Sequence, residues 1–200
     1  MSRVLVIGAT GTIGAATAEQ FRSHGDEVIE VSRSTSPSVD LSSGDSLSSL
    51  FKEIGTVDAV VCATGGSPFV NTADASLDQF RAGLEDKLLN QVNLVLAAEP
   101  HLTDNGSITL ISGILTQHPV SKSVIAGTAN GGVEAFVTSA ATDLPRGVRI
   151  NAVSPNVVRQ SLAKYGPSFP GFQPVEVDHV AGAFVRSAHG VETGQVFRVW

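Results

Sequence analysis

Three glycines spaced three residues apart form the first chemically suggestive feature of the sequence. The segment is Gly8-Ala9-Thr10-Gly11-Thr12-Ile13-Gly14, and it follows the apolar run at 4–7. Glycines here allow a tight turn, a close approach of the backbone to a ligand and tight packing of helix on strand. Backbone N–H groups at a helix start also attract anions such as pyrophosphate. The turn therefore predicts a dinucleotide-binding site made of Gly8, Thr10, Gly11, Thr12, Ile13 and Gly14.

The end of the predicted strand at 28–31 favours NADP(H). An acidic residue at this point binds the 2′-hydroxyl of NAD, whereas an arginine accommodates the 2′-phosphate of NADP. The chain continues with Ser32, Arg33 and Ser34, and no carboxylate follows the strand directly. Arg33 can pair with a phosphate through two hydrogen bonds. Glu30 lies inside the strand and is less well placed, so we predict NADP(H) as the cofactor.

The elements that must position these residues alternate between strands and helices. Short apolar runs without alternation predict strands buried on both faces, as in parallel sheets. We expect strands at 3–7, 28–31, 57–63, 107–111, 148–153 and 195–199. Apolar residues at helical spacing predict helices at 12–24, 46–54, 77–102 (one or two helices), 128–142 and 175–188. This order predicts an α/β fold: a Rossmann doubly wound parallel sheet of about seven strands, with helices on both faces, in one domain over 1–200.

Composition excludes several classes of protein. Hydrophobic residues make up 42% of the chain and charged residues 16%, which suits a folded core rather than a disordered chain. The net charge is −6 without a basic stripe, so we expect no nucleic-acid partner. No apolar run approaches the ~20 residues that span a bilayer, and no signal peptide is evident, so we expect a cytoplasmic protein without membrane contact. Cys62 is the single cysteine, and no spacing of ligands predicts a metal.

Further segments resemble the short-chain dehydrogenase/reductase family along nearly the whole chain. They are Asp40-Leu41, Cys62-Ala63-Thr64-Gly65, Ser112 at a strand end, Arg149 to Pro155, and Thr193-Gly194-Gln195. The resemblance implies that Asp40 and Leu41 bracket the adenine and that the Arg149 to Pro155 run leads to the nicotinamide site. Further cofactor-binding residues are therefore expected. They are Asp40, Leu41, Ala63, Thr64, Gly65, Lys87, Pro155, Val157 and Val158.

The sequence also departs from the family pattern. The glycine spacing is Gly-x-x-Gly-x-x-Gly instead of Gly-x-x-x-Gly-x-Gly, which is closer to extended and atypical members. Only Gly65 remains of the family's Asn-Asn-Ala-Gly, and Asn156 replaces a usual glycine.

The largest departure concerns catalysis. Family members transfer a proton through a tyrosine, supported by a lysine four residues later, a serine and an asparagine on the preceding long helix. Counting from Ser112 places the tyrosine at Ala126 and the lysine at Asn130, and the asparagine position falls at Lys87. The two helices have therefore exchanged Lys and Asn.

Two interpretations of this exchange remain open. In the first, Lys87 extends into the cleft and binds the ribose or donates the proton, since a desolvated lysine can titrate near neutrality. Asn130 would then hydrogen-bond the ribose, and Ser112 would polarise the substrate. In the second, Lys87 is a solvated helix lysine beside Glu85 and Asp86, and the site is inactive.

Other candidate residues lie on predicted loops. Tyr165, the single tyrosine, lies in the irregular stretch at 155–174 and could act as a surrogate acid. His118 and Lys122 follow Ser112 on a loop that could border the substrate. The stretch between Val158 and the last predicted helix is short compared with the family, in which this region carries helices that cover the substrate. This suggests either an open cleft with a small or polymer-attached substrate, or no substrate.

These features lead to three hypotheses of function. The first is an NADP(H)-dependent oxidoreductase that acts on a small-molecule carbonyl or alcohol by an atypical mechanism. The second is a catalytically silent NADP(H)-binding sensor or partner subunit. The third is an epimerase or dehydratase with a tightly bound cofactor. The helix at 128–142 and the long helix before Pro100 match the family's dimerisation surfaces, so we expect a homodimer or homotetramer.

Overall fold

The computed structural model describes residues 1–200 and contains one parallel sheet of six strands. The strands are β1 (Arg3–Ile7), β2 (Glu27–Val31), β3 (Val57–Cys62), β4 (Leu102–Ile111), β5 (Arg149–Pro155) and β6 (Val196–Val199). Their order is β2-β1-β3-β4-β5-β6, and every neighbouring pair is parallel. The doubly wound α/β fold is confirmed, with six strands where about seven were expected.

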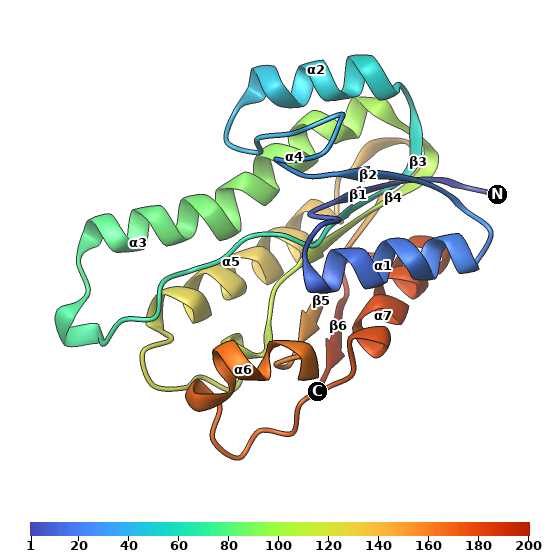
Figure 1. The fold of residues 1–200 in the computed structure, drawn as a ribbon. Coiled ribbons are helices and arrows are strands. Elements are labelled where there is room, and N and C mark those ends of the chain that lie inside the picture. Colours follow the sequence, from blue (N-terminus) through green and yellow to red (C-terminus); the bar gives the residue numbers. More distant parts are fainter.

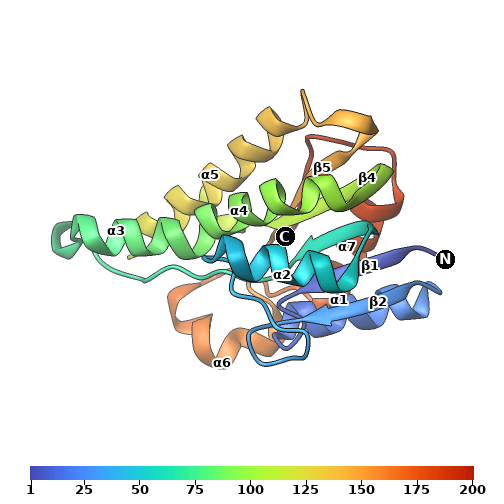
Figure 2. The same ribbon diagram turned by 90° about the horizontal axis from the view of Figure 1, so that it is seen from above.

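Helices cover both faces of the sheet and form a three-layer structure (Figure 1). On one face lie α1 (Thr12–Ser23) and α7 (Val177–His189), which bury Phe21 and Phe184 against the sheet. On the other lie α2 (Gly44–Ile54), α4 (Asn90–Ala98) and α5 (Val124–Ala140), whose apolar residues join the larger core cluster. Figure 2 shows α3 (Leu77–Leu84) continuing the line of α4 away from the sheet.

Several element boundaries differ from the sequence-based expectation. The predicted helix at 77–102 is α3, a π-helical turn at Glu85–Leu89 and α4, and β4 already begins at Leu102. Helix α5 begins at Val124 rather than at 128. Val124 and Ile125 are β-branched and have modest helix propensity, but Ile125 is fully buried, and packing outweighs propensity there.

The predicted irregular stretch at 155–174 is partly helical. It contains a turn at Arg159–Ser161, the short helix α6 (Leu162–Tyr165) and a turn at Gly166–Ser168. Its two ends are joined, because Val175 N donates to Val157 O at 3.0 Å and Asn156 Nδ2 donates to Gln173 O at 2.7 Å. The segment therefore forms a closed loop over the carboxyl end of β5.

The strand order reverses between β1 and β3, because β2 lies on one side of β1 and all later strands lie on the other. Loops after strands on either side of such a reversal diverge and leave a crevice at the carboxyl ends of the strands, where α/β proteins bind ligands. The glycine turn after β1 and the segment after β3 border this crevice. No helix in the chain has the length and apolar character needed to cross a membrane.

Candidate cofactor and active site

Two adjoining cavities lie at the carboxyl edge of the sheet. The outer cleft, of about 530 Å³, extends from the end of β2 across the glycine turn to the segment after β3. Its lining contains many of the predicted cofactor residues: Gly8, Thr10, Gly11, Ser32, Arg33, Ser34, Asp40, Leu41, Ala63, Thr64 and Gly65. Thr12 and Gly14 do not line either cavity.

The glycine turn has the geometry of a phosphate-binding turn. Gly8 has a φ of +84°, and its N–H donates to Val31 O at 2.8 Å, which fixes the turn on β2. A Cβ on Gly14 would lie 2.1 Å from Gly8 O. The role of Gly14 is therefore to let α1 pack closely on the turn, and not to contact a ligand. Gly11 caps α1 without a side-chain hydrogen bond, which leaves the first N–H groups of the helix for an anion.

The end of β2 presents the cation Arg33, and the carboxylate within the strand is paired elsewhere. Glu30 forms an ion pair with Arg22 on α1, so its carboxylate is engaged away from the cleft. Arg33 is exposed and forms no salt bridge, while Ser32 Oγ accepts a hydrogen bond from Ser34 N at 3.1 Å. Hydrogen bonds from Ser42 hold the pKa of Asp40 below its usual value, and the charge of Arg33 adds to this effect. Asp40 and Arg33 therefore face the same end of the cleft.

The inner cavity, of about 280 Å³, lies at the carboxyl ends of β4 and β5. It brings together all three predicted catalytic residues, Lys87, Ser112 and Asn130, although they come from three separate elements. The predicted cofactor-binding residues Ile13, Pro155, Val157 and Val158 line it as well. The inner cavity and the outer cleft share Ala63, Thr64, Gly65 and Gly66, so one extended ligand can occupy both.

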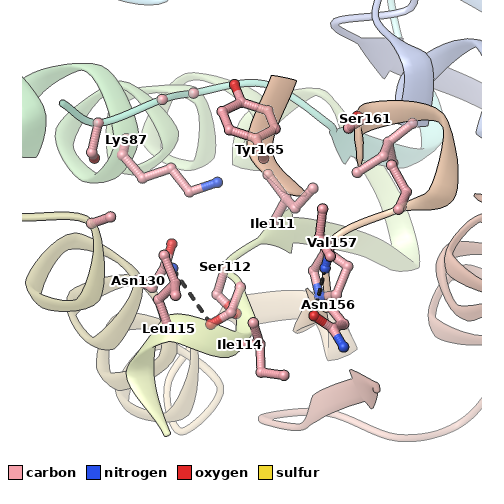
Figure 3. Close-up of a pocket in the computed structure, with 18 of the residues that line it drawn as sticks. Lys87, Ile111, Ser112, Ile114, Leu115, Asn130, Asn156, Val157, Ser161 and Tyr165 are labelled. Atoms are coloured by element: carbon pink, nitrogen blue, oxygen red, sulfur yellow. Dashed lines mark hydrogen bonds between the residues drawn. The ribbon is translucent and has the colours of Figure 1, made fainter. Parts of the chain in front are cut away.

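Lys87 lies in the π-helical turn between α3 and α4, and π turns are frequent at functional sites. The residue is 7% exposed, and its amino group forms neither a salt bridge nor a hydrogen bond. Figure 3 shows the side chain extending into the cavity between Asn130 and Tyr165. Burial lowers the pKa of Lys87 to about 8, although Cys62 and Asp86 partly oppose this shift. A solvated helix lysine would not have these properties.

Ser112 lies at the end of β4, but its hydroxyl has a partner outside the cavity. Its Oγ donates to Glu134 Oε1 at 3.0 Å, and Gln117 Nε2 donates to the other carboxylate oxygen at 2.7 Å. The single Ser112 proton is thus engaged by Glu134. The neighbouring Gly113 faces Asn130: a Cβ on Gly113 would lie 3.0 Å from Asn130 Nδ2.

Glu134 was not among the sequence candidates. It lies one helical turn after Asn130 on α5, and its signal was a lone carboxylate on a helix that is otherwise small and apolar. Among the other candidates, Tyr165 lines the inner cavity from α6 and is 37% exposed. His118 does not line it and packs instead against Trp200, with ring centroids 4.9 Å apart.

The far end of the inner cavity is apolar. Ile114, Leu115 and Ala126 form a small buried cluster there, against which Phe69 and Phe169 pack. Lys87 is the sole residue with a formal charge among those that line the cavity. The arrangement combines one buried amine with an apolar wall, next to a cleft suited to a dinucleotide.

Comparison with known proteins identifies the family of this chain. The family model described as enoyl-(acyl carrier protein) reductase matches residues 8–189. The chain therefore belongs to the short-chain dehydrogenase/reductase family, a family of oxidoreductases. The crystal structure of the protein lin1944 from Listeria innocua is 40% identical, covers 100% of both chains and has a TM-score of 0.97. A small-chain dehydrogenase solved in complex with NADPH is 25% identical over 99% of this chain and 96% of its own, with a TM-score of 0.88.

Relatives in sequence are more distant. An uncharacterized oxidoreductase of Methylorubrum extorquens is 27% identical over 78% of this chain and 62% of its own. A putative ketoacyl reductase of the granaticin polyketide synthase of Streptomyces violaceoruber is 29% identical over 52% of this chain and 44% of its own. The chain thus spans less than two thirds of the length of either relative.

Proposed function

We propose that this protein is an NADP(H)-dependent oxidoreductase that interconverts a small carbonyl compound and its alcohol with Lys87 as the proton-transferring group. The observation that most supports this is the unpaired, buried amine of Lys87 beside a dinucleotide cleft. The NADPH-bound family neighbour supports the choice of a nicotinamide cofactor. Arg33, without a salt bridge at the end of β2, supports the phosphorylated form.

The residues divide the work between the two cavities. The turn at 8–14 would bind the pyrophosphate through backbone N–H groups, and Arg33 would bind the 2′-phosphate. Val157 and Val158 would pack against the nicotinamide, and Asn130 would hydrogen-bond its ribose. NADPH supplies a hydride when bound.

Lys87 would complete the reduction. Its ammonium group donates a hydrogen bond to the substrate oxygen and then transfers a proton to it, which leaves a neutral amine that solvent protonates again. A pKa of about 8 suits both steps near neutral pH, because the two protonation states are then close in free energy. The Ser112 hydroxyl donates its hydrogen bond to Glu134, so in this proposal polarisation of the carbonyl falls to Lys87 rather than to Ser112.

The engaged hydroxyl of Ser112 also favours a second function, that of a silent NADP(H)-binding sensor or partner subunit. Without a tyrosine at Ala126 or a lysine at Asn130, cofactor binding can persist without turnover. An epimerase or dehydratase with retained cofactor is the third alternative.

Calorimetric titration with NADPH, NADP, NADH and NAD is the first test. We expect NADP(H) to bind at least about tenfold more tightly than NAD(H), a difference of about 1.4 kcal/mol. Consumption of NADPH with a panel of small aldehydes and ketones, lost in Lys87→Met, would support the reductase. Tight binding without consumption would support the sensor, and copurifying cofactor that is not consumed would support the epimerase. Failure of every dinucleotide to bind would contradict all three.

We also propose a cytoplasmic homodimer or homotetramer that associates through α4 and α5. Leu89 and Leu96, on or just before α4, are 47% and 68% exposed, which is unusual for large apolar side chains on one helix. Light scattering should show a larger mass for the native chain than for Leu96→Glu. A native chain that is monomeric at high concentration would contradict this assembly.

A further inference from the structure

The amine of Lys87 is placed as a reactive nucleophile and not merely as a charge. Side chains from three elements other than its own face it: Cys62 on β3, Asn130 on α5 and Tyr165 on α6. Asp86 is adjacent on its own turn, but its Oδ2 accepts a hydrogen bond from Gly66 N at 2.8 Å. No acceptor in the protein holds the Lys87 amino group.

The surroundings favour the neutral form of this amine. Cys62 is fully buried, and burial raises the pKa of its thiol to about 11. A lysine with a pKa of about 8 is roughly one tenth neutral at pH 7, whereas an ordinary lysine with a pKa of about 10.4 is neutral in fewer than about one molecule in a thousand. Desolvated lysines of this kind react with carbonyl compounds to form Schiff bases.

The walls of the inner cavity define the partner for such a reaction. Ile114, Leu115 and Phe69 give the cavity an apolar wall, and no second cation lines it to bind a carboxylate or phosphate. At about 280 Å³ the cavity lies just below the range of about 300–1,000 Å³ that is usual for drug-sized ligands. A small, neutral, apolar carbonyl compound fits these limits.

We propose that Lys87 captures small apolar aldehydes and ketones covalently, as an imine, in the inner cavity. The Nζ lone pair attacks the carbonyl carbon, and the C–O bond then breaks as the oxygen leaves as water with the two amine protons. A proton from solvent converts the imine to its cationic form, and hydrolysis reverses the reaction. No electron transfer and no cofactor are needed, so this reactivity is independent of the proposed oxidoreductase function.

Reductive trapping of the cofactor-free chain tests the proposal. The protein is treated at pH 7 with benzaldehyde and cyanoborohydride, which reduces the imine to a stable benzylamine, and each lysine is then quantified by peptide mass mapping. The other lysines, Lys52, Lys122 and Lys164, are all exposed and serve as internal controls. We expect Lys87 to be modified about tenfold faster than any of them, because the greater neutral fraction outweighs its lower basicity.

Two variants make the result specific. Lys87→Arg keeps a cation in place and should lose the fast modification while the other lysines react as before. Ala126→Phe should narrow the cavity and slow modification at Lys87 alone, since Ala126 lines the wall at 8% exposure. Equal rates at all four lysines, or an unchanged Lys87 rate in a folded Ala126→Phe, would overturn the proposal. Neither result depends on whether NADPH binds.

Discussion

The outer cleft and the inner cavity are formed by different parts of the chain and differ in what determines their properties. The outer cleft is shaped by backbone geometry: Gly8 has a positive φ, and Gly14 lets α1 approach. The inner cavity depends on single side chains, with Lys87 and Asn130 on opposite helices. Many side-chain substitutions would leave the outer cleft intact, whereas the exchange of Lys and Asn between positions 87 and 130 alters the chemistry of the inner cavity. In the proposed function, the cofactor cleft of the family fold is kept while the residues beside the substrate change.

The largest expected effect lies in the outer cleft. Gly14→Ala would place a Cβ 2.1 Å from Gly8 O and 2.7 Å from Gly8 C, and neither backbone atom can move without displacing α1 or β1. We expect the free energy of unfolding to fall by about 4 kcal/mol and dinucleotide binding to be lost. Urea unfolding and calorimetry measure the two effects.

Gly44→Ala is the matched control for this variant. Gly44 also lies in the first turn of a helix, but a Cβ there meets nothing within 4 Å. Its stability should stay within about 0.5 kcal/mol of the native chain or rise slightly. Equal destabilisation by both changes would contradict the close approach at Gly14.

The second effect concerns the inner cavity and is measured as the change in the free energy of unfolding when Lys87 is replaced. Burial lowers the Lys87 pKa from 10.5 to about 8, so keeping the folded chain protonated costs about 3 kcal/mol below pH 8. This cost disappears as pH rises from about 8 to 10.5, because in that range the folded chain has lost the proton while the unfolded chain still binds it. Lys87→Met should therefore raise the free energy of unfolding by up to about 3 kcal/mol at pH 7 and by little at pH 10.

Urea unfolding at both pH values measures this difference, with Lys52→Met as the control on an exposed lysine. The pKa of the Cys62 thiol is raised from 9.0 to about 11 by burial, and this thiol is present in both chains, so its titration cancels in the comparison. If Lys87→Met raised the free energy of unfolding equally at pH 10 and at pH 7, the pKa of Lys87 would not be lowered by burial.

The third effect concerns the adenosine end of the outer cleft. Arg33→Ala should weaken NADPH binding by about 2 kcal/mol and leave NADH binding nearly unchanged, since hydrogen bonds to charged groups contribute about 1.5–3 kcal/mol. Arg159→Ala, an exposed arginine paired with Glu176 outside the cleft, should change neither. Equal losses for NADPH and NADH would remove Arg33 from phosphate recognition.

The smallest effect tests the contact behind the inner cavity. Glu134→Gln keeps an acceptor for Ser112 but removes the charge, so we expect a loss of about 1 kcal/mol in stability. NADPH affinity should not change, because Glu134 lines neither cavity. A large loss of NADPH affinity in a stably folded variant would mean that Glu134 reaches the cofactor.

Sequence patterns predict the backbone features of this protein well. The glycine turn, the parallel order and the helices on both faces follow from spacing and apolar runs. Residue counting even predicts that Lys87 and Asn130 exchange places, and both line one cavity. The direction of a hydroxyl group cannot be predicted in this way. Ser112 donates a hydrogen bond to Glu134, 22 residues away, because of how the two elements pack together. The early start of α5 likewise depends on the burial of Ile125, which no local propensity encodes.

The most direct test of the account is an NMR pH titration of the chain with 13C at its lysine side chains, in the absence and presence of NADPH. Four lysine signals are expected, from Lys52, Lys87, Lys122 and Lys164. One signal, absent in Lys87→Arg, should titrate near pH 8 and shift when NADPH binds, because Lys87 lines the cavity that adjoins the proposed cofactor cleft. If no signal titrated near pH 8 and none changed its chemical shift when NADPH was added, the central role assigned to Lys87 would be contradicted.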